Sequence, residues 1–240
     1  MAYPICFVSL GPGDPELITL KGLKKLQKAD RIYCPATVGK SGKFLSRAAR
    51  IVGQLGIEEA KIRLFPLPMS KDRDEAWKAY DALYEKVVAD YGEETEIVIV
   101  AEGDAGFYSS IQYIYDKFSQ NGIGVERTAG VPAFIAAGAV AGLHIASQEE
   151  RLLVIPGMVT AEELSEKIAS GGYAIVIMKL SMCMEAVRAC IRKHPEAEFH
   201  YFENVGTEAE LYTSDTKQIM EKTFPYFSLM IIHPSQTTKK

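Results

Sequence analysis

The stretch Leu10-Gly11-Pro12-Gly13-Asp14-Pro15-Glu16 joins a strand to a helix with almost no loop between them. Before it, residues 5–10 form a short apolar run with β-branched members, which is typical of a strand buried on both faces. After it, Asp14 is a suitable N-cap, and the proline that follows suits the first turn of a helix. Gly11 and Gly13 leave the backbone bare where the chain turns, which predicts a ligand site at the carboxyl end of the strand. The alternative is a tight turn that binds nothing.

Two phosphate-binding motifs come close to the sequence and fail. The dinucleotide motif needs glycine or alanine where this chain has the charged Glu16, so NAD is not expected. Residues 39–41, Gly-Lys-Ser, end like an ATP-binding loop, but the first glycine of that motif would fall at Cys34. ATP is therefore not expected either.

Composition excludes several classes of protein. The 240 residues carry a net charge of −4, which argues against binding of nucleic acid through phosphate neutralisation. The apolar fraction of 48% can supply the core of one large domain or of two small ones. The longest nearly apolar run, residues 131–146, is broken by a proline, two glycines and a histidine, and no charged-then-apolar leader opens the chain. We therefore predict neither a membrane span nor a signal peptide, and we expect a cytoplasmic protein.

The cysteines and histidines show no spacing typical of metal ligands. There is no Cys-x-x-Cys pair and no His-Glu-x-x-His motif in the sequence. Buried free thiols in a reducing compartment explain the four cysteines best. The sequence thus predicts no protein-bound metal.

A second glycine turn follows the apolar strand at residues 97–101. Glu102 and Asp104 lie in this turn, ahead of a predicted helix. Because parallel strands end at the same edge of a sheet, this turn should lie beside the first one and form a crevice with it. Asp104 is predicted either to cap the helix or to accept a hydrogen bond from an ammonium or hydroxyl group of a ligand.

The order of the elements predicts an α/β protein with two αβ domains. Residues 1–120 alternate strands and helices, which indicates a parallel sheet. Residues 121–240 have short connections that allow antiparallel pairs, which indicates a mixed sheet. The boundary is placed in the polar turn at residues 119–122.

A basic stripe is predicted on a helix that follows Ser41. Lys43, Arg47 and Arg50 recur at spacings of four and three residues, and Lys40 lies in the preceding loop. The stripe is either a solvated face or a wall that binds carboxylates through arginine forks.

Five motifs, in this order along the chain, resemble those of the tetrapyrrole methylase family, whose members transfer a methyl group from S-adenosylmethionine. They are Gly11-Pro12-Gly13-Asp14-Pro15-Glu16-Leu17, Glu102-Gly103-Asp104 with Phe107-Tyr108-Ser109, Ala129-Gly130-Val131-Pro132, Met178-Lys179-Leu180 and Asn204-Val205-Gly206-Thr207. Ala105 and Ala129 stand where the family often has proline. Residues 149–156 and 202–207 look most like the subgroup that methylates C-20 of precorrin-2 or of cobalt-factor II in cobalamin biosynthesis.

The resemblance implies a fold of two αβ domains with S-adenosyl-L-methionine in the cleft between them, and a homodimer. Carried over position by position, it implies cofactor contacts at Leu10, Gly11, Gly13, Asp104, Phe107, Val131, Pro132, Leu180, Val205 and His233. The substrate would be a tetrapyrrole, whose carboxylates the stripe of Lys43, Arg47 and Arg50 would bind. Tyr108, Glu102 and water are the candidates for the proton acceptor. Other substrates of the family remain alternatives, namely uroporphyrinogen III, diphthine and ribosomal RNA, as does a nucleotide-sensing αβ module without catalysis.

Overall fold

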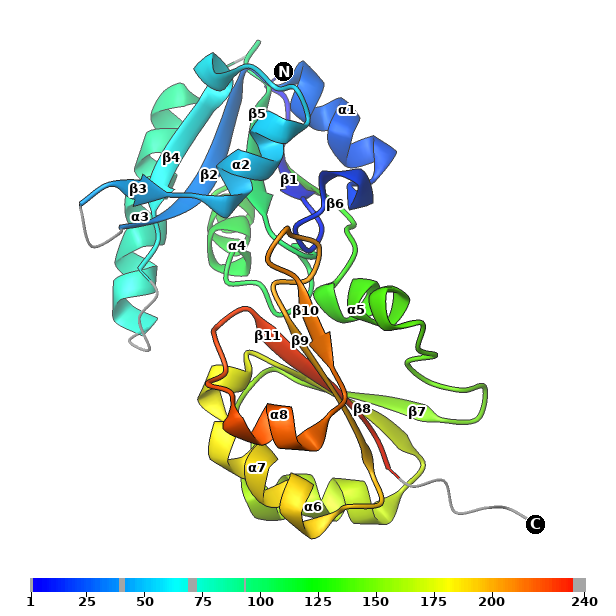
Figure 1. Ribbon diagram of the computed structural model, residues 1–240. Helices are drawn as coiled ribbons and strands as arrows, with labels where there is room; N and C mark the ends of the chain where they lie inside the picture. Colours follow the sequence, from blue (N-terminus) through cyan, green and yellow to red (C-terminus); the bar gives the residue numbers. More distant parts are fainter. Residues whose placement is uncertain (1, 39–41, 69–72, 93, 235–240) are drawn as a thin grey trace. The chain divides into compact units, whose positions relative to one another are not determined.

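The computed structural model describes residues 2–38, 42–68, 73–92 and 94–234 (Figure 1). The chain divides into two compact units, Met1–Pro132 (unit 1) and Ala133–Lys240 (unit 2). The boundary that the sequence analysis placed after residue 120 is therefore too early. Strand β6 (Val125–Thr128), assigned from the sequence to the second domain, pairs with β1 (Ile5–Ser9) and so completes the first sheet.

Unit 1 is built on a sheet in which all the strands except β3 run parallel. Its order is β3-β2-β5-β1-β6, and β4 also pairs with β2. The remaining strands are β2 (Arg31–Val38), β3 (Phe44–Leu45), β4 (Ile62–Pro66) and β5 (Ile97–Ala101). Every residue of β1 and β5 is buried, in agreement with the apolar runs that predicted strands covered on both faces.

Helices cover both faces of this sheet, which gives three layers (Figure 1). The helices are α1 (Leu20–Lys28), α2 (Arg47–Gln54), α3 (Arg73–Asp90) and α4 (Gln112–Gln120), with short 3-10 helices at Pro15–Leu17 and Glu59–Lys61. One core contains residues of α1 and α2, and the other contains residues of α3 and α4. The alternation of side chains along each strand divides the apolar residues of the sheet between these two cores.

Three helices begin later than the sequence predicted. Asp14 accepts a hydrogen bond from the backbone N–H of Glu16, but it caps only a 3-10 turn, and α1 begins at Leu20 behind the N-cap Thr19. The helix expected after Asp104 begins only at Gln112. Helix α2 begins at Arg47 with Ser46 as its N-cap, whereas the predicted cap Ser41 lies outside the described residues.

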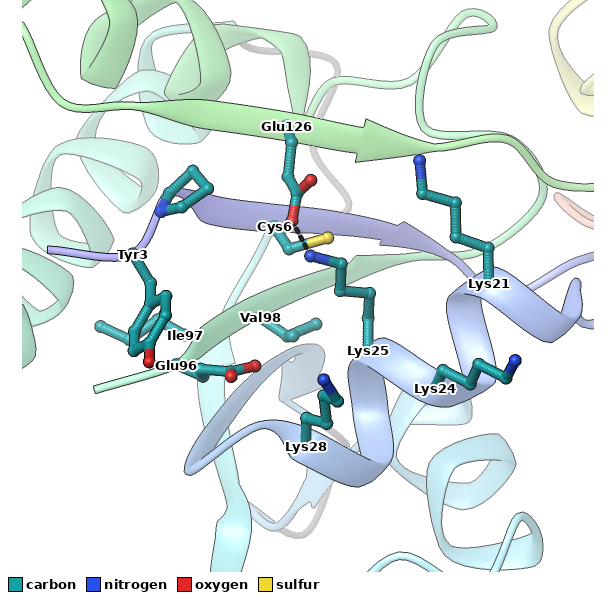
Figure 2. Close-up of a pocket in the computed structure, with 11 residues that line it drawn as sticks. Tyr3, Cys6, Lys21, Lys24, Lys25, Lys28, Glu96, Ile97, Val98 and Glu126 are labelled. Carbon is teal, nitrogen blue, oxygen red and sulfur yellow. Dashed lines mark hydrogen bonds and ion pairs between the residues drawn. The ribbon is translucent and has the colours of Figure 1, made fainter. Parts of the chain in front are cut away.

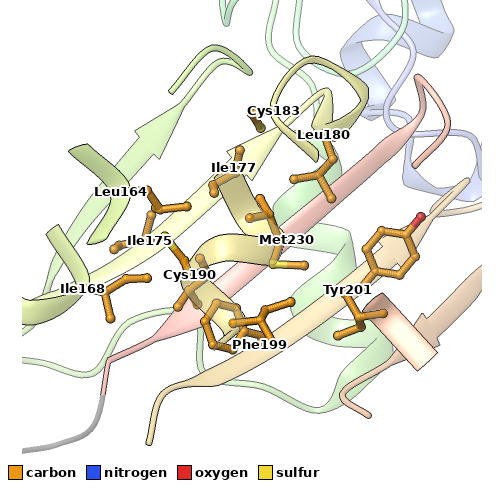
Figure 3. Close-up of a cluster of buried hydrophobic side chains, with 14 of the residues drawn as sticks. Leu164, Ile168, Ile175, Ile177, Leu180, Cys183, Cys190, Phe199, Tyr201 and Met230 are labelled. Atoms are coloured by element: carbon orange, nitrogen blue, oxygen red, sulfur yellow. The ribbon is translucent and has the colours of Figure 1, made fainter. Parts of the chain in front are cut away.

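Unit 2 contains a mixed sheet of order β10-β9-β11-β8-β7, as the short connections predicted. Its strands are β7 (Arg151–Ile155), β8 (Tyr173–Met178), β9 (Glu198–Glu203), β10 (Leu211–Thr213) and β11 (Ser228–His233). Its helices are α5 (Ala133–Ala141), α6 (Ala161–Ser170), α7 (Met184–Lys193) and α8 (Thr216–Glu221), with a 3-10 helix at Leu180–Met182. Figure 3 shows the core between this sheet and helices α6 and α7, where Leu164 and Cys190 pack toward Ile175, Phe199 and Met230. Among the described residues, no helix is long and apolar enough to cross a membrane.

Candidate functional site

Two glycine turns lie side by side at the carboxyl edge of the unit 1 sheet. Strands β1 and β5 are neighbours in register, with Ser9 opposite Ala101, so both turns leave the sheet at the same level. Gly11 N–H donates to the carbonyl of Gly103 over 3.1 Å, and Gly103 N–H donates to the carbonyl of Gly11 over 2.7 Å. The sequence predicts this adjacency, and the pairing of the strands confirms it.

Asp104 ties this pair of turns to the loop that follows β6. Its Oδ1 accepts from the N–H of Gly106 at 2.7 Å, and its Oδ2 accepts from the N–H of Gly130 at 2.7 Å. Because α4 begins only at Gln112, the predicted role of Asp104 as a helix cap is wrong. The carboxylate instead fixes two loops against each other through hydrogen bonds that its charge strengthens.

The buried Ser9, which the sequence did not point to, also links the two glycine turns and the loop after β6. Ser9 is fully buried, and its hydroxyl donates to the carbonyl of Thr128 at 2.6 Å while accepting from the N–H of Ala105 at 2.8 Å. Gly130 packs directly on it, because a Cβ at position 130 would lie 2.4 Å from Ser9 Cβ and 2.6 Å from the carbonyl oxygen of Gly103. A hydroxyl in an otherwise apolar strand was the only signal of this network in the sequence.

Arg47 and Glu102 form an ion pair beside the first turn. Arg47 Nε lies 3.2 Å from Glu102 Oε2, and its guanidinium also donates to the carbonyl of Pro12 at 3.3 Å. Burial raises the pKa of the Glu102 carboxyl, and the positive charges of Arg47 and Arg50 act in the opposite direction. Arg47 therefore already holds the first turn to the end of β5.

The structure separates the three residues of the predicted basic stripe. Lys43 precedes β3 and is exposed, so it does not belong to the helix that carries Arg47 and Arg50. Arg50 is exposed on α2. Lys40 lies outside the described residues. The prediction of one helical stripe is thus wrong, since a two-residue strand interrupts the helical spacing.

Phe107 and Tyr108 lie in the loop between β5 and α4. Their rings meet edge to face at 4.8 Å, and Tyr108 is 50% exposed. Tyr108 has a φ of 50°, Lys179 one of 54° and Asn204 one of 49°, and these are the only non-glycine residues with positive φ in the described part of the chain. All three follow the carboxyl end of a strand, where strained backbone often accompanies a functional site.

The unit 2 sheet brings two of the predicted residues to one edge and places the third at the other. Leu180 follows β8 and Val205 follows β9, and the N–H of Asn204 donates to the carbonyl of Phe227 at 2.8 Å, just before β11. His233 ends β11 and lies opposite Glu198, the first residue of β9. Because β11 runs antiparallel to both neighbours, His233 is at the opposite edge from Leu180 and Val205. The structure therefore does not bring His233 together with the other two residues.

Several of the predicted contacts could reach a ligand only through the backbone. Leu10 and Leu180 are fully buried in the two cores, and Val205 is 5% exposed. Val131 and Pro132 are partly exposed in the loop after β6.

A cavity among the described residues lies away from these loops (Figure 2). It measures about 550 Å³ and is lined by Tyr3, Cys6, Glu96 and the lysines of α1. These residues lie near the amino ends of β1 and β5, whereas the glycine turns follow the carboxyl ends. Figure 2 shows Lys25 directed at Glu126 of β6, with which it forms an ion pair.

Comparison with known proteins points to one family. Residues 4–219 match the family of tetrapyrrole (corrin/porphyrin) methylases. A precorrin-2 C(20)-methyltransferase from Sinorhizobium sp. is 28% identical over 232 residues, which cover 94% of this chain and 93% of that protein. A probable cobalt-precorrin-2 C(20)-methyltransferase from Methanocaldococcus jannaschii is 31% identical over 172 residues, which cover 72% of this chain and 70% of that protein.

Solved structures show the same fold at low sequence identity. A cobalt precorrin-4 methyltransferase is similar with a TM-score of 0.68 and 16% identity, over 95% of this chain and 94% of that one. Uroporphyrin-III C-methyl transferase from Thermus thermophilus, in complex with S-adenosyl homocysteine, is similar with a TM-score of 0.67 and 16% identity, over 96% of this chain and 97% of that one.

Proposed function

We propose that this chain, which belongs to the family of tetrapyrrole (corrin/porphyrin) methylases, transfers the methyl group of S-adenosylmethionine to C-20 of precorrin-2 or of its cobalt-containing counterpart, cobalt-factor II. The observation that carries the proposal is the nearly full-length match to a C(20)-methyltransferase, which covers 94% of this chain and 93% of the relative. The reaction would belong to the biosynthesis of cobalamin.

We assign the binding of S-adenosylmethionine to the three joined loops at the carboxyl edge of unit 1. Gly103 has a φ of 69°, and a Cβ placed there would meet no atom within 4 Å, so the backbone is open on that side. The carboxylate of Asp104 has lone pairs beyond the two that accept from Gly106 and Gly130, and these suit an ammonium or hydroxyl group. The bare backbone and the fixed acceptor together fit this ligand. Contacts from Leu180 and Val205 stay predictions from the family resemblance.

The chemistry requires alignment more than activation. S-adenosylmethionine supplies a methyl group on a positively charged sulfur; the C–S electron pair stays on sulfur as the methyl bonds to C-20, and C-20 loses its proton. The loops of unit 1 would hold the donor in line with the acceptor carbon, which is the main source of rate enhancement when no protein nucleophile is needed. Since Glu102 is paired with Arg47, we give it a structural role and keep the exposed Tyr108, or water, as the candidate acceptor of the C-20 proton.

The activity is tested by incubating the purified protein with S-adenosylmethionine carrying a ¹³C-methyl group and each of three acceptors, namely precorrin-2, cobalt-factor II and uroporphyrinogen III. We expect one methyl group to be added to one or both of the first two acceptors, and nuclear magnetic resonance to locate it at C-20. Methylation of uroporphyrinogen III alone would assign the chain to another activity of the family. Binding of S-adenosylmethionine without any transfer would favour a nucleotide-sensing module.

Lys43 and Arg50 are the exposed cations that remain candidates for binding the acetate and propionate groups of the substrate. We expect the double change Lys43→Ala with Arg50→Ala to raise the KM for the tetrapyrrole about thirtyfold at low salt, because two partly exposed contacts of roughly 1 kcal/mol each are lost. Affinity for S-adenosylmethionine should stay unchanged.

The matched control is Lys24→Ala with Lys28→Ala. This control removes the same charge from α1, where the two lysines line the cavity near the amino ends of the strands. Equal KM values for the two double variants would show that Lys43 and Arg50 are solvated and do not bind the substrate.

We further propose that the enzyme acts as a homodimer in the cytoplasm, without nucleic acid or membrane as a partner. The four cysteines are free and buried, which fits a reducing compartment. The net charge of −4 gives no general attraction to phosphate backbones.

A further inference from the structure

Three potential metal ligands meet on the face of the unit 2 sheet that lies opposite its main core. Glu198 and His200 alternate along β9 and so share a face, and His233 of β11 lies directly opposite Glu198. One donor atom from each of the three lies within 4.8 Å of the other two. The antiparallel pairing brings together residues that are far apart in the sequence, which is why no ligand spacing was visible there.

The two imidazoles are held by hydrogen bonds that leave one ring nitrogen of each for another partner. His233 Nε2 lies 3.2 Å from the carbonyl of Ile145, and because a carbonyl can only accept, this nitrogen carries the proton and Nδ1 has the lone pair. His200 Nδ1 lies 3.0 Å from the hydroxyl of Tyr212. Metal-binding histidines are commonly oriented in this way, by a hydrogen bond from the nitrogen that does not bind the ion.

His200 Nε2 is the unusual atom of the group. The residue is 7% exposed, and this nitrogen makes no hydrogen bond to any described residue. Its nearest acidic neighbour is Glu198 Oε2 at 3.5 Å, which is too long for a good hydrogen bond. A buried polar atom without a partner is costly, and a bound cation would remove that cost.

We propose that Glu198, His200 and His233 bind a divalent transition-metal ion, for which zinc is the best fit. Two imidazoles and one carboxylate are a ligand set that zinc uses, with a fourth position left for water. The Glu198 side chain is 73% exposed, so it can turn toward an ion that enters from solvent. The inference revises the prediction that the protein binds no metal.

The proposed ion is distinct from any cobalt inside the substrate. His233 and Glu198 lie at the edge of the unit 2 sheet opposite to Leu180 and Val205, although the family resemblance assigns His233 to the cofactor together with those two residues. The inference does not rest on the proposed methyl transfer, and metal binding is measured without a tetrapyrrole.

The test is a titration of untagged protein, freed of metal with a chelator that is then removed, with zinc chloride by calorimetry and with cobalt(II) by visible absorption. We expect one equivalent of zinc to bind with a Kd in the micromolar range or tighter. Glu198→Gln and His233→Ala should each weaken binding by at least about tenfold. His144→Ala is the matched control, because His144 is exposed and outside the cluster, and it should leave the Kd unchanged.

Three outcomes would overturn the proposal. They are the absence of zinc binding at one equivalent, an unchanged Kd in the double variant Glu198→Gln with His233→Ala, and a cobalt(II) spectrum of the thiolate type, which would place the ion at cysteines. Glu198 is exposed, so Glu198→Gln should leave the fold intact, and circular dichroism of each variant identifies any that is unfolded. If His233→Ala or the double variant is unfolded, the Kd of Glu198→Gln for zinc decides whether the proposal holds.

Discussion

The change Gly130→Ala is expected to destabilise unit 1 by about 3 kcal/mol or more and to abolish measurable binding of S-adenosylmethionine. The added Cβ would lie 2.4 Å from Ser9 Cβ and 2.6 Å from the carbonyl oxygen of Gly103. Neither neighbour is the end of a flexible side chain, so the loop after β6 would have to move away from β1 and from the loop after β5. That movement would also break the hydrogen bond from Gly130 N–H to Asp104.

The measurement is urea denaturation followed by tryptophan fluorescence. Trp77, on α3 of unit 1, is the only tryptophan in the chain, so its signal reports unfolding of unit 1. The matched control is Gly53→Ala in α2, where a Cβ would meet nothing within 4 Å and alanine should stabilise the helix by about 0.5–1 kcal/mol. A midpoint for Gly130→Ala as high as that of the wild type would show that the loops do not pack as described.

The change Asp104→Ala is expected to weaken binding of S-adenosylmethionine by about 10- to 100-fold. Two hydrogen bonds to a charged acceptor are lost, and with them the link between the loops after β5 and β6. The stability of unit 1 should fall as well, by about 1–3 kcal/mol, because the N–H groups of Gly106 and Gly130 lose their partner. Calorimetry with S-adenosylmethionine and with S-adenosylhomocysteine measures the affinity.

Asp215→Ala provides the control for a lost aspartate cap. Asp215 accepts from the N–H of Lys217 at 2.9 Å as the N-cap of α8 in unit 2, so its removal should lower stability without changing affinity. If Asp104→Ala behaved like Asp215→Ala, Asp104 would be a structural residue and the assignment of the cofactor to these loops would fail.

The sequence predicted the α/β class and the two kinds of sheet because continuous apolar strands and short connections are local patterns. It missed the domain boundary because pairing is not local. Residues 125–128 form a short strand with two charged members, and nothing in their own sequence indicates that β1, more than a hundred residues earlier, is their partner. The start of a helix was predicted too early where a good cap residue, such as Asp14, caps a single 3-10 turn and not the α-helix that follows it.

The cofactor site was predicted from motifs, as with Gly11, Gly13 and Asp104, and what the structure confirms is that their two turns are adjacent. The contributions of Ser9 and Gly130 could not be predicted, because both follow from the contact of β1 with β6. His233 was grouped with Leu180 and Val205 through the family resemblance. Strand direction decides which edge of the sheet a residue reaches, and that direction is set by pairing.

The position of β1 between β5 and β6 also constrains how the protein is made. Strand β1 is synthesised before the other strands of unit 1, but its two partners are the last strands of that unit, since Cys6 pairs with Val98 and Glu126. The backbone N–H and C=O groups of β1 stay unpaired until β5 and β6 have been synthesised. Contacts between residues so distant in sequence also form slowly. Unit 2 has no such delay, because its strands pair within residues 151–233. The three joined loops can therefore become ordered only in one late event, when β6 docks, and a nascent chain that stops short of Thr128 exposes an apolar edge for chaperones to recognise.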